Sequence, residues 1–128
     1  MKYTAVYASL FALFYLGLAY NVIRHRYRSR VPIGDGGDEQ LLRAIRVHAN
    51  AAEYAPLALL LTGMYELNGG YVLLVNILGA VLILARVLHL WGLGRSSGRS
   101  KGRYYGTLLT WATIMTASVM NMINMISV

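Results

Sequence analysis

The stretch from Arg43 to Pro56 places charged and polar side chains inside a segment that otherwise has the length and apolarity of a membrane helix. At about 100° per residue, its polar members share one sector of a helix. This polar stripe consists of Arg43, Arg46, Asn50, Glu53 and Tyr54. A charge at membrane depth is costly unless it faces a bundle interior or a water-filled cavity. The polar stripe is therefore a candidate functional site.

The composition indicates a membrane protein. Of the 128 residues, 57% are hydrophobic and 13% are charged, whereas a soluble domain carries about twice as much charge. A net charge of +7 would suggest nucleic-acid binding in a soluble protein. Here the basic residues cluster in predicted loops, which fits membrane topology and anionic lipid headgroups, so we expect no nucleic-acid partner. The chain has no cysteine, which excludes disulfides and thiolate zinc sites.

Four long segments predict an all-α, integral membrane four-helix bundle in a single domain, residues 1–128. The predicted helices span about residues 3–25, 38–67, 71–93 and 104–127. The first apolar run has about 20 residues, enough to cross a hydrocarbon core of about 30 Å and too long for the apolar part of a signal peptide. Asp38 is placed to N-cap the second helix.

The basic residues predict the orientation in the membrane. Eight of the twelve lysines and arginines lie in the first and third predicted loops, and four arginines fall between Arg24 and Arg30. By the positive-inside rule, these loops face the cytoplasm and both termini face away from it. We expect Arg24 to Arg30 to serve topology and lipid contacts. Arg86 and His89 of the third helix approach the same side of the membrane as Arg43.

The spacing RxxRxxxNxxEYxP of the polar stripe resembles the second-helix signature of the MAPEG family, the membrane-associated proteins in eicosanoid and glutathione metabolism. The runs RVPIGDGG, AIRVHANAAEYAPLAL and ELNGG are similar to its small bacterial branch, and ARxxH at Arg86 to His89 extends the resemblance over nearly the whole chain. The resemblance implies a homotrimer in the bacterial inner membrane, with glutathione bound between subunits near the cytoplasmic face. It also implies transferase or peroxidase activity on lipophilic substrates.

The resemblance also assigns roles by position. The residues that match glutathione-binding positions, or lie beside them, are Arg43, Arg46, Asn50, Glu53, Tyr54, Arg86 and His89. The thiol-activating arginine of the family lies near the start of the fourth helix, where Arg103 matches best and Arg99 is the alternative. Arginine suits carboxylates because it binds them bidentately. A cation beside a thiol favours the thiolate, which is the nucleophile.

Other interpretations remain open. The chain could be a non-catalytic lipid- or thiol-binding scaffold of the same fold, or a small transporter, although no acidic residue precedes Asp35. Arg46 and Glu53 could form an internal ion pair, and Arg43 and Arg103 could anchor at the membrane interface. His48 points off the polar stripe, which favours packing or a trimer contact.

We expect no metal site. The partners we expect are a lipophilic substrate, membrane lipid and further copies of the chain. The sequence does not distinguish glutathione from another anionic thiol as the ligand.

Overall fold

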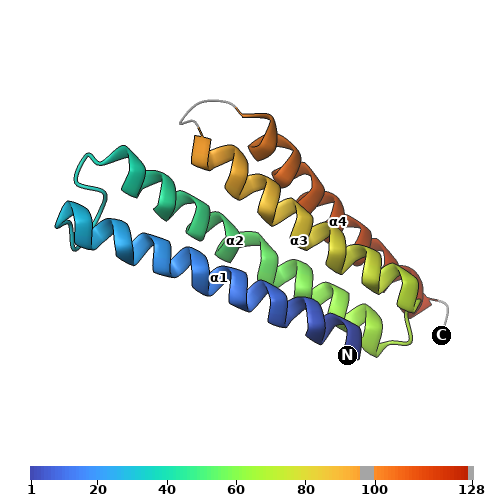
Figure 1. Ribbon diagram of the computed structural model, residues 1–128. Coiled ribbons are helices and arrows are strands. Elements are labelled where there is room, and N and C mark those ends of the chain that lie inside the picture. Colours follow the sequence, from blue (N-terminus) through green and yellow to red (C-terminus); the bar gives the residue numbers. More distant parts are fainter. Residues whose placement is uncertain (96–99, 127–128) are drawn as a thin grey trace.

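The computed structural model describes residues 1–95 and 100–126, which form four α-helices and no strand. The helices are α1 (Lys2–Ser29), α2 (Glu39–Leu67), α3 (Val72–Arg95) and α4 (Lys101–Ile126). The predicted all-α, four-helix class is confirmed. Successive helices run in opposite directions, so the N-terminus and the end of α4 lie at one end of the bundle, and the α1–α2 loop lies at the other (Figure 1).

Two helix boundaries differ from those expected from the sequence. α1 continues to Ser29, so Arg24, Arg26 and Arg28 lie on its last turns rather than in a loop. Basic side chains suit this position because a helix ends with partial negative charge on its free carbonyl groups. α4 begins at Lys101, which brings Arg103 onto its first turn. The expected end of the fourth helix, at residue 127, lies outside the described residues.

Three helices in the described part of the chain are long and apolar enough to cross a membrane: α1, residues 72–92 of α3, and α4. α2 carries the polar stripe, which interrupts its apolar sequence. Within residues 1–95 and 100–126, α2 and α3 each contact all three other helices, whereas α1 and α4 do not contact each other. The helix with the most charged residues is thus among the two that contact the most other helices, as expected from the cost of exposing charge to lipid.

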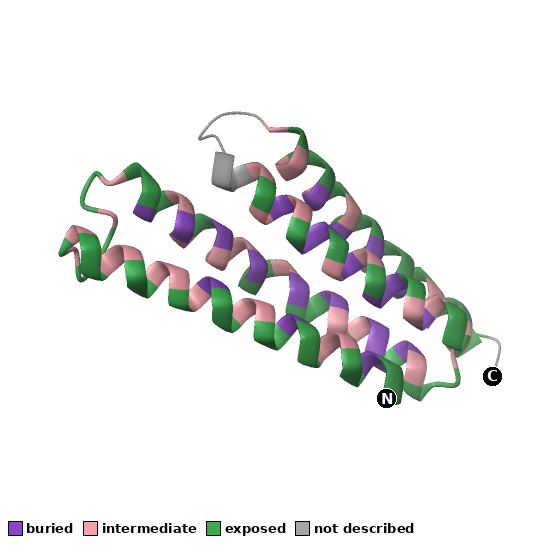
Figure 2. Ribbon diagram, viewed as in Figure 1, coloured by how far each residue is buried: buried purple, intermediate pink, exposed green. Residues whose placement is uncertain are grey.

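A regular spacing of buried residues on α1, and small buried residues on α2 and α4, allow the helices to pack together. The buried residues of α1 are Thr4, Phe11 and Leu18, seven residues apart, and this repeat places side chains on one seam of a helix. Four of the buried residues of α2 are alanines. α4 buries Gly106, which lies so close to α3 that an added Cβ would be 2.7 Å from the Ala85 carbonyl oxygen. The buried residues follow the inward faces, and much of α1 and α4 is exposed (Figure 2).

Asp38 fixes the start of α2, which confirms the predicted N-cap. Its Oδ1 accepts hydrogen bonds from the backbone N–H groups of Gln40 (2.8 Å) and Leu41 (3.1 Å), and its Oδ2 accepts one from the Ser29 hydroxyl. These donors, Ser29 first, hold the pKa of the Asp38 carboxyl below its ordinary value. Asp38 therefore joins the last residue of α1 to the first turn of α2.

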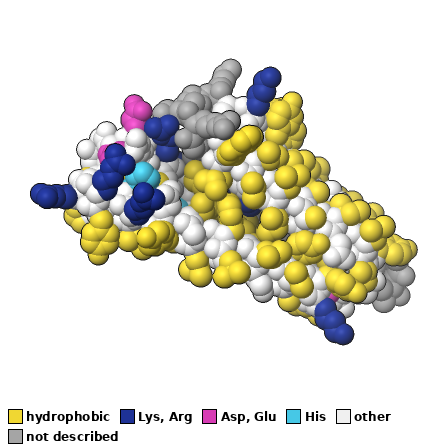
Figure 3. All heavy atoms as spheres, viewed as in Figure 1, with side chains coloured by type: hydrophobic (Ala, Val, Ile, Leu, Met, Phe, Trp, Pro, Cys, Tyr) yellow, Lys and Arg dark blue, Asp and Glu magenta, His cyan; other side chains and the backbone are white. Residues whose placement is uncertain are grey.

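The surface separates charge from apolar side chains. Basic side chains gather over the end of the bundle that carries the α1–α2 loop, and hydrophobic side chains cover most of the rest of the visible face (Figure 3). Large exposed apolar residues, among them Leu13, Leu16 and Met115, lie along α1 and α4. Such a surface suits contact with lipid or with further protein in the membrane.

Candidate functional site

A cleft of about 930 Å³ is lined by residues of α2, α3 and the first turns of α4. This central cleft is within the size range of small-molecule sites, about 300–1,000 Å³. Its amide, imidazole and cationic lining side chains are Asn50, His89, Lys101 and Arg103. Its aromatic lining side chains are Tyr104, Tyr105 and Trp111. Residues that the sequence predicted for the site therefore line the same cleft from three different helices.

Arg86 lies where α2, α3 and α4 meet and is only 2% exposed. Its Nη1 donates to Oδ1 of Asn50 (2.8 Å), and its Nη2 donates to the Gly106 carbonyl (3.2 Å) and to the Thr110 hydroxyl. All of these acceptors are neutral, and the buried Nε has no hydrogen-bond partner. Among the described residues, Arg86 forms no ion pair with a carboxylate. A buried cation held only by dipoles creates a positive potential that attracts an anion.

The bond from Arg86 determines how Asn50 faces the central cleft. Because Asn50 Oδ1 accepts from Arg86, its Nδ2 hydrogens are left to donate to a ligand. His89, one turn after Arg86 and 6% exposed, lies on the same wall. No aspartate or glutamate occurs among the described residues that line the cleft. The polar part of the cleft therefore favours a ligand rich in acceptor oxygens.

The other part of the central cleft is aromatic. Trp111 packs against Tyr54 with ring centroids 6.4 Å apart, so the last residue of the polar stripe borders the cleft through the indole. Tyr104 and Tyr105 meet edge to face, with centroids 5.4 Å apart. Large rings of this kind form apolar walls that keep a polar edge. The cleft thus joins a cationic region to an apolar one.

Three members of the polar stripe lie away from the central cleft. Arg43 lines a smaller cleft of about 280 Å³ together with Asn21 and His25 of α1, and its Nε donates to the Glu39 carbonyl (3.3 Å). Arg46 and Glu53 are exposed, and no ion pair joins them within the described residues. The structure therefore brings together Asn50, Arg86, His89 and Arg103, with Tyr54 at the border.

His48 has a packing contact, as its position off the polar stripe suggested. Its ring stacks on Tyr15 of α1, with centroids 4.4 Å apart and an interplanar angle of 21°. Within residues 1–95 and 100–126, no three histidine, aspartate or glutamate side chains are grouped in a way that could hold a metal ion.

Two residues at the site gave no functional signal in the sequence. Thr110 accepts from Arg86, and its own hydroxyl donates to the Gly106 carbonyl one turn earlier (2.8 Å). Trp111 links Tyr54 to the cleft. Both lie on a helix whose threonines and aromatic residues have the composition of packing positions and membrane anchors. Arg99, the alternative thiol-activating residue, lies outside the described residues.

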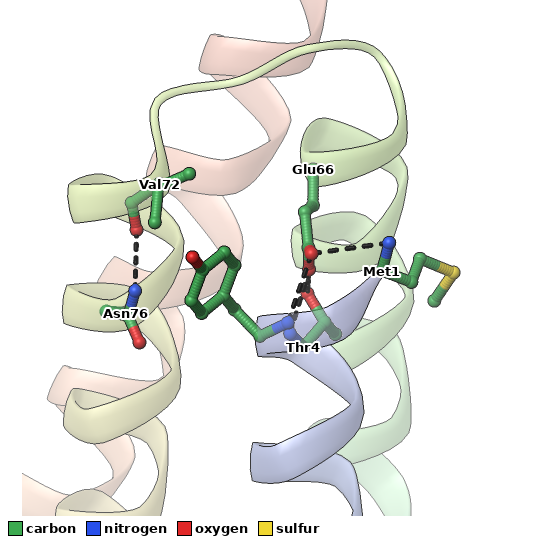
Figure 4. A network of polar contacts seen from close by, with 6 residues as sticks. Met1, Thr4, Glu66, Val72 and Asn76 are labelled. Carbon is green, nitrogen blue, oxygen red and sulfur yellow. Dashed lines mark hydrogen bonds and ion pairs between the residues drawn. The ribbon is translucent and has the colours of Figure 1, made fainter.

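A second polar cluster lies at the opposite end of the bundle, where Glu66 of α2 meets the start of α1 (Figure 4). Its carboxylate accepts hydrogen bonds from the backbone N–H groups of Tyr3 (3.1 Å) and Thr4 (2.8 Å) and from the Thr4 hydroxyl (2.6 Å). It also lies 3.3 Å from the Met1 ammonium. Glu66 therefore caps α1 from a neighbouring helix.

Comparison with known proteins gives one family. The family model of the MAPEG family matches residues 4–123, which include most of α1 and α4, all of α2 and α3, and every residue of the central cleft. Inner membrane protein YecN of Escherichia coli strain K12 is 37% identical over 119 residues, which cover 93% of this chain and 89% of that protein. The YecN protein of Escherichia coli O6:H1 gives the same identity and coverage.

Proposed function

The chain belongs to the MAPEG family, as its second-helix pattern indicated, and from this premise we propose that it is a membrane-embedded, glutathione-dependent transferase or peroxidase. Its second substrates are lipophilic electrophiles. The observation that carries the proposal is the central cleft, in which hydrogen-bond donors and cations stand beside aromatic side chains. An anionic thiol fits the first part of the cleft, and a lipid-soluble partner fits the second.

Glutathione carries two carboxylates, one ammonium and one thiol, and the polar wall offers donors that match its carboxylates. The Nδ2 of Asn50 and the ammonium of Lys101 donate to carboxylate or peptide oxygens. Arg86 supplies positive potential from behind this wall. His89 adds a ring nitrogen at the same surface. Because such a site is built from donors, it discriminates against ligands that lack acceptor oxygens.

Arg103 is the group we propose for thiol activation. A free thiol has a pKa of about 8.5 and is mostly protonated at neutral pH. A guanidinium beside it favours the thiolate by charge, and the proton leaves to solvent. The thiolate sulfur then bonds to the electrophilic carbon while the leaving group departs with the bonding electrons. With a hydroperoxide, two glutathione thiols supply the two electrons, giving an alcohol, water and glutathione disulfide.

We propose that the active form is a homotrimer and that the ligand lies at a subunit interface. The exposure of Arg46 and Glu53 on α2 supports this, since two opposite charges at membrane depth need partners that the described residues of one chain do not provide. A neighbouring subunit and the bound tripeptide would cover them. The location proposed is the bacterial inner membrane, by similarity to the inner membrane protein YecN.

A specific observation favours a second candidate, a non-catalytic scaffold that binds a lipid or thiol. Arg86 already has three neutral acceptors from α2 and α4, so it ties the helices together without any ligand. A scaffold would keep these bonds and would bind an amphiphile in the cleft without turnover.

The experiment is glutathione conjugation to an activated aryl halide, and glutathione-dependent reduction of a lipid hydroperoxide, by the purified protein in detergent. We expect turnover by the wild type and a loss of about 100-fold in Arg103→Gln, within the range for removing one electrostatic catalytic group. Arg24→Gln is the matched control, since Arg24 is exposed on α1. Binding of glutathione without turnover of either substrate would instead favour the scaffold.

A further inference from the structure

A separate groove of about 440 Å³ lies at the end of α1 and is formed by one continuous stretch of chain. This loop groove is lined by Ile23, Arg26, Tyr27, Arg30, Val31 and Pro32. It shares no lining residue with the central cleft or with the smaller cleft at Arg43. Its arginines belong to the basic segment that the proposed function leaves without a role.

The groove is built by contacts within the chain. Nη1 of Arg26 donates to the carbonyl oxygens of Val31 (3.2 Å), Pro32 (3.3 Å) and Gly34 (2.8 Å), which folds the loop back against α1. Arg30 has a left-handed backbone (φ 57°), and its N–H bonds to the Arg26 carbonyl. The shape of the groove is thus determined by Arg26 and by the turn at Arg30 without a ligand.

The loop groove is surrounded by arginines that form no ion pairs among the described residues. Arg24, Arg28 and Arg30 are exposed, and none of them forms an ion pair among the described residues. The nearest acids along the chain are already engaged: Asp35 accepts from the Gly37 N–H, and Asp38 caps α2. No aspartate or glutamate occurs among the described residues that line the groove.

Exposed apolar side chains stand beside these arginines. Tyr27 is 83% exposed and Ile33 is 88% exposed, while Ile23 contributes an aliphatic wall. α1 is a candidate membrane span that ends at Ser29, so the groove lies where the span meets the headgroup region. Tyrosine and arginine are suited to that depth, because each combines an apolar body with a polar end.

We propose that the loop groove binds the phosphate of an anionic phospholipid. The Arg30 guanidinium takes the phosphate oxygens, as arginine does in bidentate pairs, and the acyl chains lie along Ile23 and the rest of α1. Anionic phospholipid is the occupant that matches both features, since a soluble anion would use the arginines and leave the apolar side chains without a partner. The site is independent of the proposed activity.

The test is lipid retention, measured by native mass spectrometry of the full-length protein transferred from mixed micelles of phosphatidylglycerol and phosphatidylcholine. We expect wild type to retain phosphatidylglycerol preferentially and Arg30→Gln to retain at least about tenfold less, as expected for the loss of hydrogen bonds between a guanidinium and a phosphate. Arg28→Gln is the matched control, because Arg28 is exposed on the same segment but does not line the groove. It should lose about fivefold at most, because Arg28 contributes only the diffuse attraction of one surface cation.

Arg30→Gly is a second variant that removes the guanidinium without disturbing the fold, because glycine adopts the left-handed backbone without strain. It should lose retention as Arg30→Gln does. Equal losses in Arg28→Gln and Arg30→Gln would overturn the proposal in favour of diffuse surface charge. Displacement of the lipid by inorganic phosphate at equal concentration would also overturn it, because the headgroup anion alone would then account for binding.

Discussion

Glu66 and Arg86 are two largely buried charged residues of one small bundle, and they are satisfied in different ways. The Glu66 carboxylate accepts from Tyr3, Thr4 and the Met1 ammonium, so both oxygens have partners (Figure 4). Arg86 has neutral acceptors only, and its buried Nε has none. Glu66 borders none of the clefts described, whereas the Arg86 partner Asn50 lines the largest.

We propose that this difference separates a structural charge, Glu66, from one that serves ligand binding, Arg86. A charge with a full set of partners stabilises the arrangement of its helices and has no capacity left for a ligand. A charge with an incomplete set, beside an open cleft, retains potential that a bound anion can use. Position in a membrane helix alone would have marked both residues as candidate sites.

The largest effect is expected from Arg86→Met, which removes the cation and leaves Asn50 and Thr110 without their donor. Glutathione binding should weaken more than tenfold, and the free energy of unfolding should fall by about 3 kcal/mol, because hydrogen bonds to a charged group contribute about 1.5–3 kcal/mol each. Calorimetry and denaturant unfolding in detergent measure the two quantities. Undiminished binding would show that the cleft does not use this charge.

Asn50→Asp separates binding from folding. The new carboxylate would pair with Arg86 and preserve the contact between α2 and α3, but it would remove the Nδ2 donor from the central cleft and add a negative charge there. Binding of anionic glutathione should weaken about tenfold, equivalent to about 1.4 kcal/mol, while the unfolding midpoint stays at or above that of the wild type. Equal affinity in the variant and the wild type would contradict the donor role of Asn50.

Glu66→Gln should lower stability and leave glutathione binding unchanged, the opposite of what we expect for Asn50→Asp. The amide keeps one acceptor oxygen but loses the charge that faces the α1 N-terminus. We expect the free energy of unfolding to fall by about 1 kcal/mol, typical of a weakened cap or hydrogen bond, with glutathione affinity unchanged. A loss of affinity matching that of Arg86→Met would remove the distinction between the two ends.

The smallest effect concerns pH and Asp38. Its folded-state pKa lies below the ordinary value, so the unfolded chain binds a proton more readily. Its contribution to stability is therefore present above about pH 4 and is lost as the pH falls through the folded pKa. Asp38→Asn keeps the cap and removes the charge. The difference in unfolding midpoint between wild type and Asp38→Asn should shrink between pH 6 and pH 3.5; a constant difference would contradict the assignment.

Much of the fold follows from the sequence, because apolar length and helix caps are local properties. The helical class and the Asp38 cap could be predicted in this way. The end of α1 at Ser29 could not, since the left-handed turn at Arg30 is accompanied by a contact in which Arg26 donates to the carbonyl oxygens of Val31, Pro32 and Gly34. That contact requires the loop to fold back on the helix.

The site was predictable in residue type and only partly in arrangement. Helical spacing shows that Arg46, Asn50 and Glu53 share a face, but which part of that face meets α3 depends on tertiary packing. The bond between Asn50 and Arg86 joins residues 36 positions apart. The contact of Thr110 with Arg86 could not be predicted, because it depends on how α4 packs against α3.

Titration of glutathione into the wild-type protein and Glu66→Gln, by calorimetry with thiolate absorbance recorded in parallel, tests the central claim most directly. The account predicts saturable heat and a thiolate signal of equal size in both proteins, because the ligand binds at the Arg86 end of the bundle. An absence of heat and of thiolate at millimolar glutathione would contradict it, as would loss of both signals in a folded Glu66→Gln protein.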